Sequence, residues 1–448
     1  MTLSKKFFAL TPLCALLAAG SAHATNGMLM EGYGPISAGM GGASQAIDHG
    51  NAAMAQNPAT LGLMADGTAR LDVAVGILGP DVKSSMMGMD AKSGGTSYVM
   101  PAFGYSRRSG ALTYGIGMFA QGGMGTEYEA TSFMSAGTGL PSRSELGVGN
   151  LIAPVAFQVN PNVTVGATLK FIWSSLDVQM NGPLSQIKDM MTGGQGGLAT
   201  NMGMMANGMV PGVNPNTTIA RIDFSDSSKF SGAAKSTGLG ASIGATFKTS
   251  KDVTMGASYQ FKTALADMKT ASSSANLGIV GMLSDSGQMS VIDFQMPAVL
   301  AVGASWQASP ALLLAADVKS IAWADAMKSF KMRYDSDKAG MGFVTFAIPQ
   351  NWKDQTVLNL GLAWKANEQL TVRTGLNLAD NPIPDTYVNP LFPATVRNHF
   401  TLGMGYKVSE TADINAAISL APTVTVTGGG ITISHAQSNM QLMYTQRF

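Results

Sequence analysis

The chain has 448 residues with 28 basic and 27 acidic side chains, a balance that offers no basic surface for nucleic acid. Only 12% of the residues are charged, about half the share usual in soluble proteins, whereas 53 are glycine. Beyond the N-terminal leader no apolar run is long enough for a transmembrane helix, so the composition points to a closed β-barrel, the other fold that spans a membrane.

The first 24 residues have the layout of a secretory signal peptide. Lys5 and Lys6 precede an apolar stretch at residues 7–19, and an Ala-His-Ala sequence at residues 22–24 supplies the cleavage site. Cleavage removes Cys14, the one cysteine, so neither a disulfide nor a thiolate metal site is expected in the mature chain. Subtracting the two lysines from 28 leaves 26 basic against 27 acidic residues.

Residues 25–66 show no strand pattern and are expected to fold as a compact hatch inside the barrel. Five glycines lie between residues 32 and 42, and an alanine-rich stretch at residues 43–55 predicts a short helix. A rigid turn should follow, because proline fixes φ and asparagine can hydrogen-bond its own backbone. This turn consists of Asn57, Pro58 and Ala59.

Residues 67–448 are expected to form the barrel, because apolar residues alternate there with small or polar ones. One face of the first strand carries Leu71, Val73, Val75 and Ile77. Short turns alternate with long connections, which is typical of outer-membrane barrels and not of soluble sandwiches. About fourteen strands are predicted, beginning near Leu71, Tyr98, Ala111, Glu145, Val163, Ser236, Val253, Ala298, Ala311, Val357, Gln369, Asn398, Ala412 and Ser438.

The long connections are expected to be loops, and the longest are residues 179–235, 266–297 and 325–356. The first two are rich in methionine, and Met190 and Met204 are candidate ligand contacts because methionine adapts to ligands of varied shape. The alternative is that these residues reflect the overall usage of methionine, which occurs 31 times in the chain.

The last strand ends on an aromatic residue, Phe448, after an alternating run from Met440. A terminal phenylalanine of this kind resembles the signal that the outer-membrane assembly machinery reads. Trp364 and Tyr406 lie near the short turns of their strands, where an aromatic girdle is expected at the membrane surface. The C-terminal pattern therefore indicates the outer membrane of a Gram-negative bacterium.

Several segments resemble the FadL family of long-chain fatty acid channels, and together they span the mature chain in the family's order. One is the hatch with its Asn-Pro-Ala turn, and another is the glycine-rich sequence after the third strand, at residues 121–128. The others are residues 352–354, 370–375 and 380–384.

The resemblance implies a fourteen-stranded barrel closed by its hatch, with a hydrophobic ligand captured between the outer loops. Release would be sideways into outer-membrane lipid, through a gap where the third strand kinks inward. Gly122 and Gly123 are the candidate kink, because glycine adopts backbone angles that other residues resist. The implied partners are a hydrophobic small molecule and membrane lipid, with no cofactor.

Three basic residues, Lys170, Lys262 and Arg373, fall on the inward face of their strands by the alternation. Buried charges of one sign are costly unless paired, so a protein carboxylate or a ligand head group should lie near them. The members of the family that transport fatty acids are similar to one another in carrying a basic side chain near the end of the fifth strand. This chain has Ser174 and Ser175 at that place. Long-chain fatty acids are the first expectation, and neutral or aromatic hydrocarbons are the alternative.

Other classes of function are weighed against this channel. A barrel enzyme of the phospholipase type needs a serine and a histidine at the membrane rim; Ser242 matches a G-x-S-x-G pattern, but within a strand rather than a strand-to-helix turn. An open porin for polar solutes would have no use for the hatch and would carry more charge in its lumen. No metal-binding motif is found, so no metal is assigned. No catalytic residue is assigned either.

Overall fold

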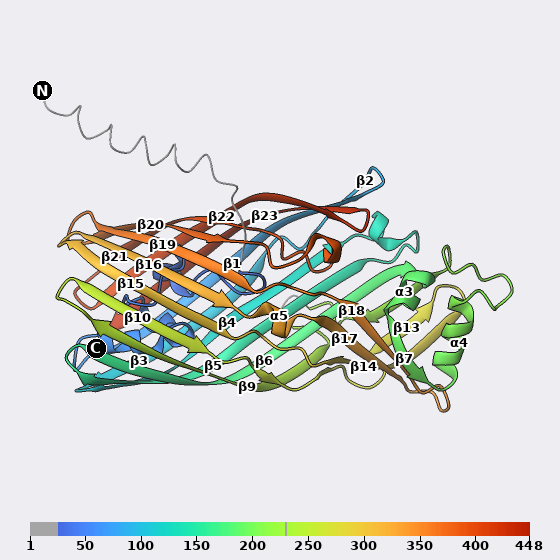
Figure 1. Ribbon diagram of the computed structural model, residues 1–448, viewed down its shortest axis with the longest axis horizontal. Coiled ribbons are helices and arrows are strands. Elements are labelled where there is room, and N and C mark those ends of the chain that lie inside the picture. The colour runs from blue at the N-terminus through green and yellow to red at the C-terminus, as the bar shows by residue number, and fades with distance from the viewer. Residues whose placement is uncertain (1–25, 229–230) are drawn as a thin grey trace, which may run out of the picture.

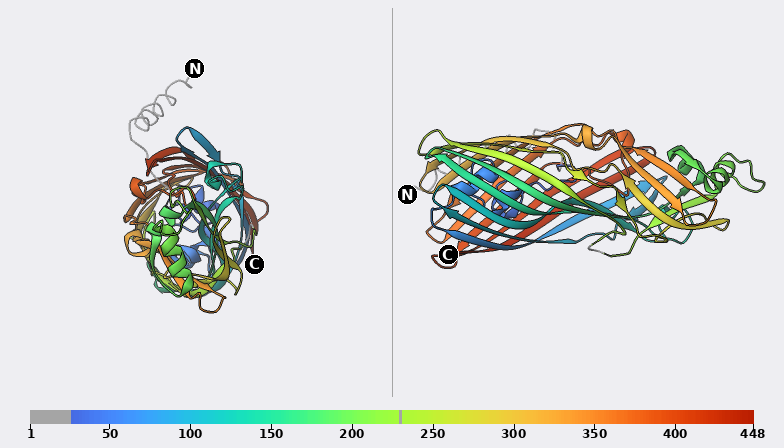
Figure 2. Two further views of the ribbon diagram at one scale, coloured as in Figure 1. Left: turned by 90° about the vertical axis from the view of Figure 1, so that its right-hand side faces the viewer. Right: turned by 90° about the horizontal axis from the view of Figure 1, so that it is seen from below.

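The computed structural model describes residues 26–228 and 231–448 and forms one antiparallel sheet of 23 strands, rolled into an elongated barrel (Figures 1 and 2). The expected signal peptide, residues 1–24, lies outside the described residues. Within the described ranges, no helix has the length and apolar character needed to cross a membrane.

The wall of the barrel is a ring of fourteen strands that closes where the last strand pairs with the first. In ring order these are β1 (Ala69–Met86), β3 (Tyr98–Ser109), β4 (Leu112–Tyr128), β5 (Ser142–Asn160), β6 (Val163–Pro183), β9 (Ala234–Lys248), β10 (Val253–Gln260), β15 (Val299–Ser309), β16 (Leu312–Ile321), β19 (Gln355–Lys365), β20 (Leu370–Ala379), β21 (His399–Lys407), β22 (Ala412–Gly428) and β23 (Ile431–Arg447). Each predicted strand start corresponds to one of these strands.

Nine further strands make the total larger than the fourteen predicted, and they lie in connections that were expected to be loops. They are β2 (Met89–Lys92), β7 (Met191–Gln195), β8 (Ile219–Phe224), β11 (Ala264–Leu265), β12 (Met268–Lys269), β13 (Ala275–Ile279), β14 (Leu283–Ile292), β17 (Ser329–Ser336) and β18 (Phe343–Pro349). Some pair with strands of other connections, as in the β8–β13, β14–β17 and β7–β18 pairs, and others pair with wall strands or within their own connection. The three longest connections therefore extend the sheet beyond the wall.

The helices outside the N-terminal segment are short and lie in the connections. They are η3 (Phe133–Ser135), α3 (Leu184–Met190), α4 (Gly197–Ala206), α5 (Trp323–Ala326) and η4 (Asp385–Tyr387). The helices α3 and α4 lie at the end of the barrel opposite to the C-terminus (Figure 1). The buried side chains of this end form the largest hydrophobic cluster in the described chain, including Leu184, Leu198, Phe224 and Tyr334.

The alternation seen in the sequence separates the two faces of the wall. Val73 on β1 is 54% exposed, whereas its neighbour Asp72 is buried in the lumen. Exposed apolar side chains recur around the ring, so the outer face suits lipid. Phe448 is exposed, and its backbone exchanges hydrogen bonds with Ala69, which joins the end of the chain to the start of β1.

The N-terminal segment, residues 26–68, lies within the barrel (Figures 1 and 2) and contains α2 (Gly34–Ala38), η1 (Gly50–Ala55) and η2 (Pro58–Leu63). The predicted helix at residues 43–55 is wrong, because only η1 forms there, as a 3-10 helix. The barrel wall takes the place of helical partners: backbone N–H groups of Ser44 and Gln45 donate to Asp317 Oδ2 at 2.7 and 3.1 Å.

Candidate functional site

A gap in the wall separates β3 from β4. The hydrogen-bonded ladder between them ends at the pair Phe103 and Met118. Beyond it, the first residues of β3 pair with β1, while β4 continues to Tyr128 with β5 as its neighbour in the wall. The strand β4 therefore does not end near residue 121, as the sequence suggested, and the ladder breaks beside it instead.

The N-terminal segment supplies partners for β4 at the gap. Gly122 forms a β-bridge with Leu29, and the backbone N–H of Gly123 donates to Met28 O at 3.2 Å. A Cβ atom on Gly122 would stand 2.0 Å from Met28 O, so only glycine fits against this segment. The register of β4 against β5 also shifts between Ala120 and Gly122, which bends the strand locally.

Tyr33 adds a side-chain contact at the same place, donating from its hydroxyl to Gln121 O at 2.7 Å. Burial raises the pKa of Tyr33, and the nearby Glu31 raises it further, so the group stays a neutral phenol that can donate. The backbone of residues 121–123 is thereby held from the lumen side rather than by β3.

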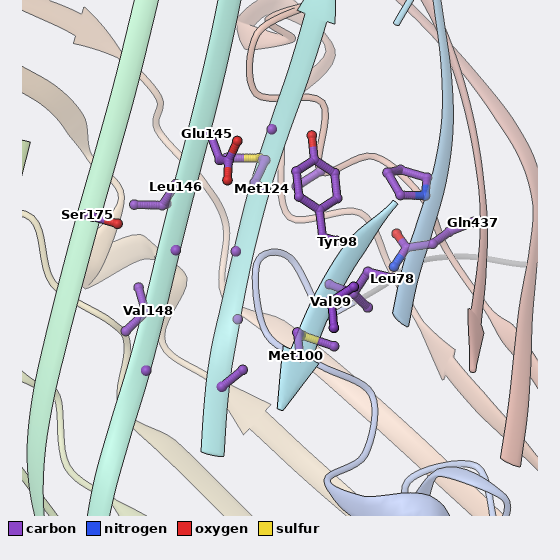
Figure 3. A pocket seen from close by; sticks show the side chains of 18 of the residues that line it. Leu78, Tyr98, Val99, Met100, Met124, Glu145, Leu146, Val148, Ser175 and Gln437 are labelled. Atoms are coloured by element: carbon purple, nitrogen blue, oxygen red, sulfur yellow. The ribbon is translucent and has the colours of Figure 1, made fainter. Parts of the chain in front are cut away.

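A cavity of about 400 Å³ opens at the gap. It is bounded by β1, β3, β4, β5, β6 and β23 together with residues 393–396. Leu78, Val99 and Met100 lie on one side, and Leu146 and Val148 lie across from them (Figure 3). The walls are therefore mostly apolar, as in sites that bind small hydrophobic molecules.

The polar side chains in the cavity wall are Tyr98, Glu145, Ser175, His435 and Gln437. Among the described residues, no lysine or arginine lines this cavity. Glu145 is paired with Arg143, whose guanidinium also lies 3.4 Å from Glu127 and 3.6 Å from Asp177. One cation thus serves three carboxylates, and the surroundings of the cavity carry an excess of negative charge.

The three basic residues predicted as ligand contacts lie elsewhere. Lys170 is buried and its Nζ donates to Gln260 Oε1 at 2.6 Å, while Arg373 donates to Asn415 Oδ1 at 3.0 Å. Five strands of the ring (β9, β10, β15, β16 and β19) lie between those two residues. Lys262 was expected to face inward but is exposed, in an ion pair of 2.8 Å with Asp325.

The methionines predicted as contacts are also outside the cavity. Met190 ends α3 and packs against the large hydrophobic cluster, and Met204 of α4 is 40% exposed. Three other methionines line the cavity, namely Met100, Met118 and Met124. Of these, Met124 belongs to the glycine-rich segment at residues 121–128, so that segment was the available signal for the site.

The Asn-Pro-Ala turn lies deep in the lumen, against the wall rather than the cavity. Asn57 Oδ1 accepts from Ala59 N at 3.1 Å, and its Nδ2 donates to Gln45 O at 2.8 Å and to Ala245 O at 3.3 Å. Pro58 and Ala59 are buried where Gly166 leaves space, since a Cβ there would stand 2.6 Å from Ala59 N.

The residues considered for other chemistry are buried in the lumen. Ser242 of the G-x-S-x-G sequence exchanges a hydrogen bond of 2.5 Å with Thr168 and does not face the membrane rim. His49, His399 and His435 are likewise buried. In the part of the chain that the structure describes, no group of three or more His, Cys, Asp or Glu side chains could hold a metal ion.

The chain is similar to known proteins in both sequence and fold. The model of a family described as "Outer membrane protein transport protein (OMPP1/FadL/TodX)" matches residues 15–443. The crystal structure of the P. putida toluene transporter TodX is 31% identical, with a TM-score of 0.82 over 93% of this chain and 99% of that chain. The toluene transporter TbuX of Ralstonia pickettii is 29% identical, with a TM-score of 0.77 over the same shares.

A curated relative from Chlorobium limicola matches only in part. It is described as "Uncharacterized protein in phosphoenolpyruvate carboxykinase gene 5'region" and is 45% identical over 84 residues. The match is 19% of this chain and 41% of that protein, so this chain spans less than half the length of that relative.

Proposed function

As a member of the OMPP1/FadL/TodX family, this chain is an outer-membrane channel for hydrophobic compounds and not an enzyme, and we propose that its substrates are neutral aromatic hydrocarbons. The family resemblance and the outer-membrane location expected from the sequence are thereby confirmed. Two relatives of similar fold are described as toluene transporters. Long-chain fatty acids, the first expectation, give way to the hydrocarbons that were the alternative.

The residues that line the cavity are the main support for a neutral aromatic substrate. Among the described residues its walls include no lysine or arginine, and Glu145 in the wall belongs to the group of three carboxylates around Arg143. A fatty carboxylate would lose its hydration there without gaining a cation, which is costly. A neutral ring loses nothing polar and gains about 25 cal/mol for each Å² of apolar surface buried.

We further propose that residues 25–66 act as a hatch and that substrate leaves sideways through the gap between β3 and β4. The cavity lies at that gap, so an apolar ligand reaches lipid without crossing water. The backbone groups of Gly122 and Gly123 that would face the gap find partners in the N-terminal segment. Such pairing makes an opening in the wall tolerable beside lipid.

Uptake of radiolabelled toluene and palmitate tests the choice of substrate. In a Gram-negative host without its own channels of this family, we expect expression of the chain to raise toluene uptake several-fold and to leave palmitate at background. Val148→Arg places a cation and extra bulk in the apolar wall and should abolish toluene uptake. Leu402→Ala, on the exposed outer face of the wall, is the control for a substitution away from the cavity. Palmitate uptake above toluene uptake would overturn the proposal.

A further inference from the structure

His435 of β23 is buried in the cavity wall and has one ring nitrogen without a partner among the described residues. Its Nδ1 lies 2.6 Å from Pro393 O, and its Nε2 forms no hydrogen bond. A carbonyl oxygen can only accept, so Nδ1 carries the hydrogen of this bond. In the neutral imidazole, Nε2 is then an acceptor only.

Gln437, two residues further along β23, also lines the cavity. Its Nε2 donates to Asn439 Oδ1 at 2.9 Å. Asn439 in turn directs Nδ2 to the Glu31 carboxylate, at 3.3 and 3.4 Å. Ser419 donates to the same carboxylate.

The direction of this chain of hydrogen bonds is fixed by its end. Asn439 presents its NH₂ group to the Glu31 carboxylate oxygens, which accept, and its own oxygen to Gln437. Gln437 must then direct its NH₂ group toward Asn439, which leaves Gln437 Oε1 free to accept. The β23 side of the cavity therefore holds two acceptors, His435 Nε2 and Gln437 Oε1.

We propose that the cavity selects, among neutral aromatic molecules, those that carry one hydrogen-bond donor, such as alkylphenols. A buried acceptor without a partner costs free energy that a ligand hydroxyl recovers, whereas an ether or a hydrocarbon leaves it unpaired. Tyr98 does not change this preference, because its hydroxyl lacks a described partner and can donate or accept. Glu145 disfavours the ionised phenolate, so the neutral phenol is the bound form.

This inference rests on the proposed function, and three ligands of equal size test it. They are 4-propylphenol, 4-ethylanisole and butylbenzene, titrated calorimetrically into the purified full-length mature protein against a detergent blank. We expect the phenol to bind about five to ten times more tightly than the anisole, the worth of one net hydrogen bond. Equal affinities of the wild-type protein for the phenol and the anisole would overturn the inference.

Substitutions of His435 and Gln437 test whether these two acceptors cause the preference for the phenol. We expect the phenol-to-anisole affinity ratio to fall in His435→Leu and to fall in Gln437→Met, which keeps the length of the side chain. Ser434→Ala is the control, because Ser434 adjoins His435 but bonds Thr425 instead. An unchanged ratio in both acceptor variants would contradict the inference. Gln437→Met keeps the test valid if His435→Leu fails to fold, as judged by circular dichroism.

Glu31→Gln tests the direction of the relay from outside the cavity. Without an acceptor-only end, the Asn439 and Gln437 amides can turn over and present an NH₂ group to the ligand, so the anisole should gain relative to the phenol. A ratio that stays at the wild-type value would argue against the relay. Binding of butylbenzene without a preference for the phenol defeats this inference alone. Binding of palmitate but not butylbenzene defeats the proposed function as well.

Discussion

At the scale of single residues, His49 of the N-terminal segment is a pH-sensitive position. Burial lowers its pKa to about 4, and Asp48, Arg70 and Lys319 are the charged groups around it. Because the unfolded value is about 6.5, its contribution to the stability of the packed segment is complete above pH 6.5. The contribution is lost as the pH falls from 6.5 towards 4, since only the released segment binds the proton there.

We therefore expect hydrogen exchange in the segment around His49 to be faster at pH 4.5 than at pH 7.5, after correction for the intrinsic exchange rate. His49→Phe should remove most of this difference. Asp48, whose pKa is lowered despite burial because of Arg70 beside it, loses its own contribution only at lower pH. The same pH dependence in wild-type protein and His49→Phe would rule out His49 as its source.

Single residues also show where sequence reasoning reached and where it stopped. Gly122 and Gly123 were singled out because residues 121–128 resemble the family's glycine-rich segment and because glycine tolerates backbone angles that other residues resist. His435 and Gln437 were missed, since alternation identifies the lumen face of β23 but not which part of it borders the cavity. The same limit explains Lys170 and Arg373, which face inward and are satisfied by amide oxygens away from the site.

At the scale of elements, a substitution in β4 tests the proposed exit through the gap between β3 and β4. Replacing Gly122 with Val would set a side chain where Met28 O now lies 2.0 Å from the Cβ position, so the N-terminal segment must withdraw or β4 must straighten. We expect toluene uptake to fall severalfold in Gly122→Val while the barrel still assembles, because β4 pairs with β5 up to Tyr128.

Gly203→Ala in α4 is the matched control for this substitution, because nothing lies within 4 Å of a Cβ atom there. Assembly is followed by the heat-modified mobility of the folded barrel on a denaturing gel. Normal toluene uptake by well-assembled Gly122→Val would remove the support for exit through the gap between β3 and β4.

Among the elements, the strands of the wall were predictable. Each wall strand pairs with the next wall strand along the chain, to which a turn or a longer connection joins it. A period-two pattern is sufficient to find such strands. The last strand was placed too late because β22 and β23 form a long hairpin, turned by Gly429 and Gly430 at positive φ, where a loop was expected. Strands such as β8 and β13 owe their pairing to distant connections, which alternation within one segment does not reveal.

At the scale of the whole molecule, the wall forms the closed barrel and the N-terminal segment occupies its lumen. The ring of strands closes by direct pairing of β1 with β23. The segment nevertheless fills the lumen with hydrogen bonds to the wall, such as Asn51 Nδ2 to Gly104 O at 2.8 Å and Arg108 to Gly62 O at 2.6 Å. We therefore expect the wall to assemble without the N-terminal segment.

Deleting residues 25–60 from the mature chain should therefore open the lumen to small polar solutes while the barrel continues to assemble. We expect the ion conductance in planar lipid bilayers to rise by an order of magnitude or more over that of the wild-type protein. Asp317→Ala is a milder variant: it removes the acceptor for the N–H groups of Ser44 and Gln45 but leaves the segment in place, so it should cause brief openings rather than a permanent pore. Leu402→Ala on the outer wall should leave the conductance unchanged. If the deletion variant assembles and conducts no more than the wild-type protein, the segment is not what closes the lumen, and the polar route must be blocked by the connections at the far end of the barrel.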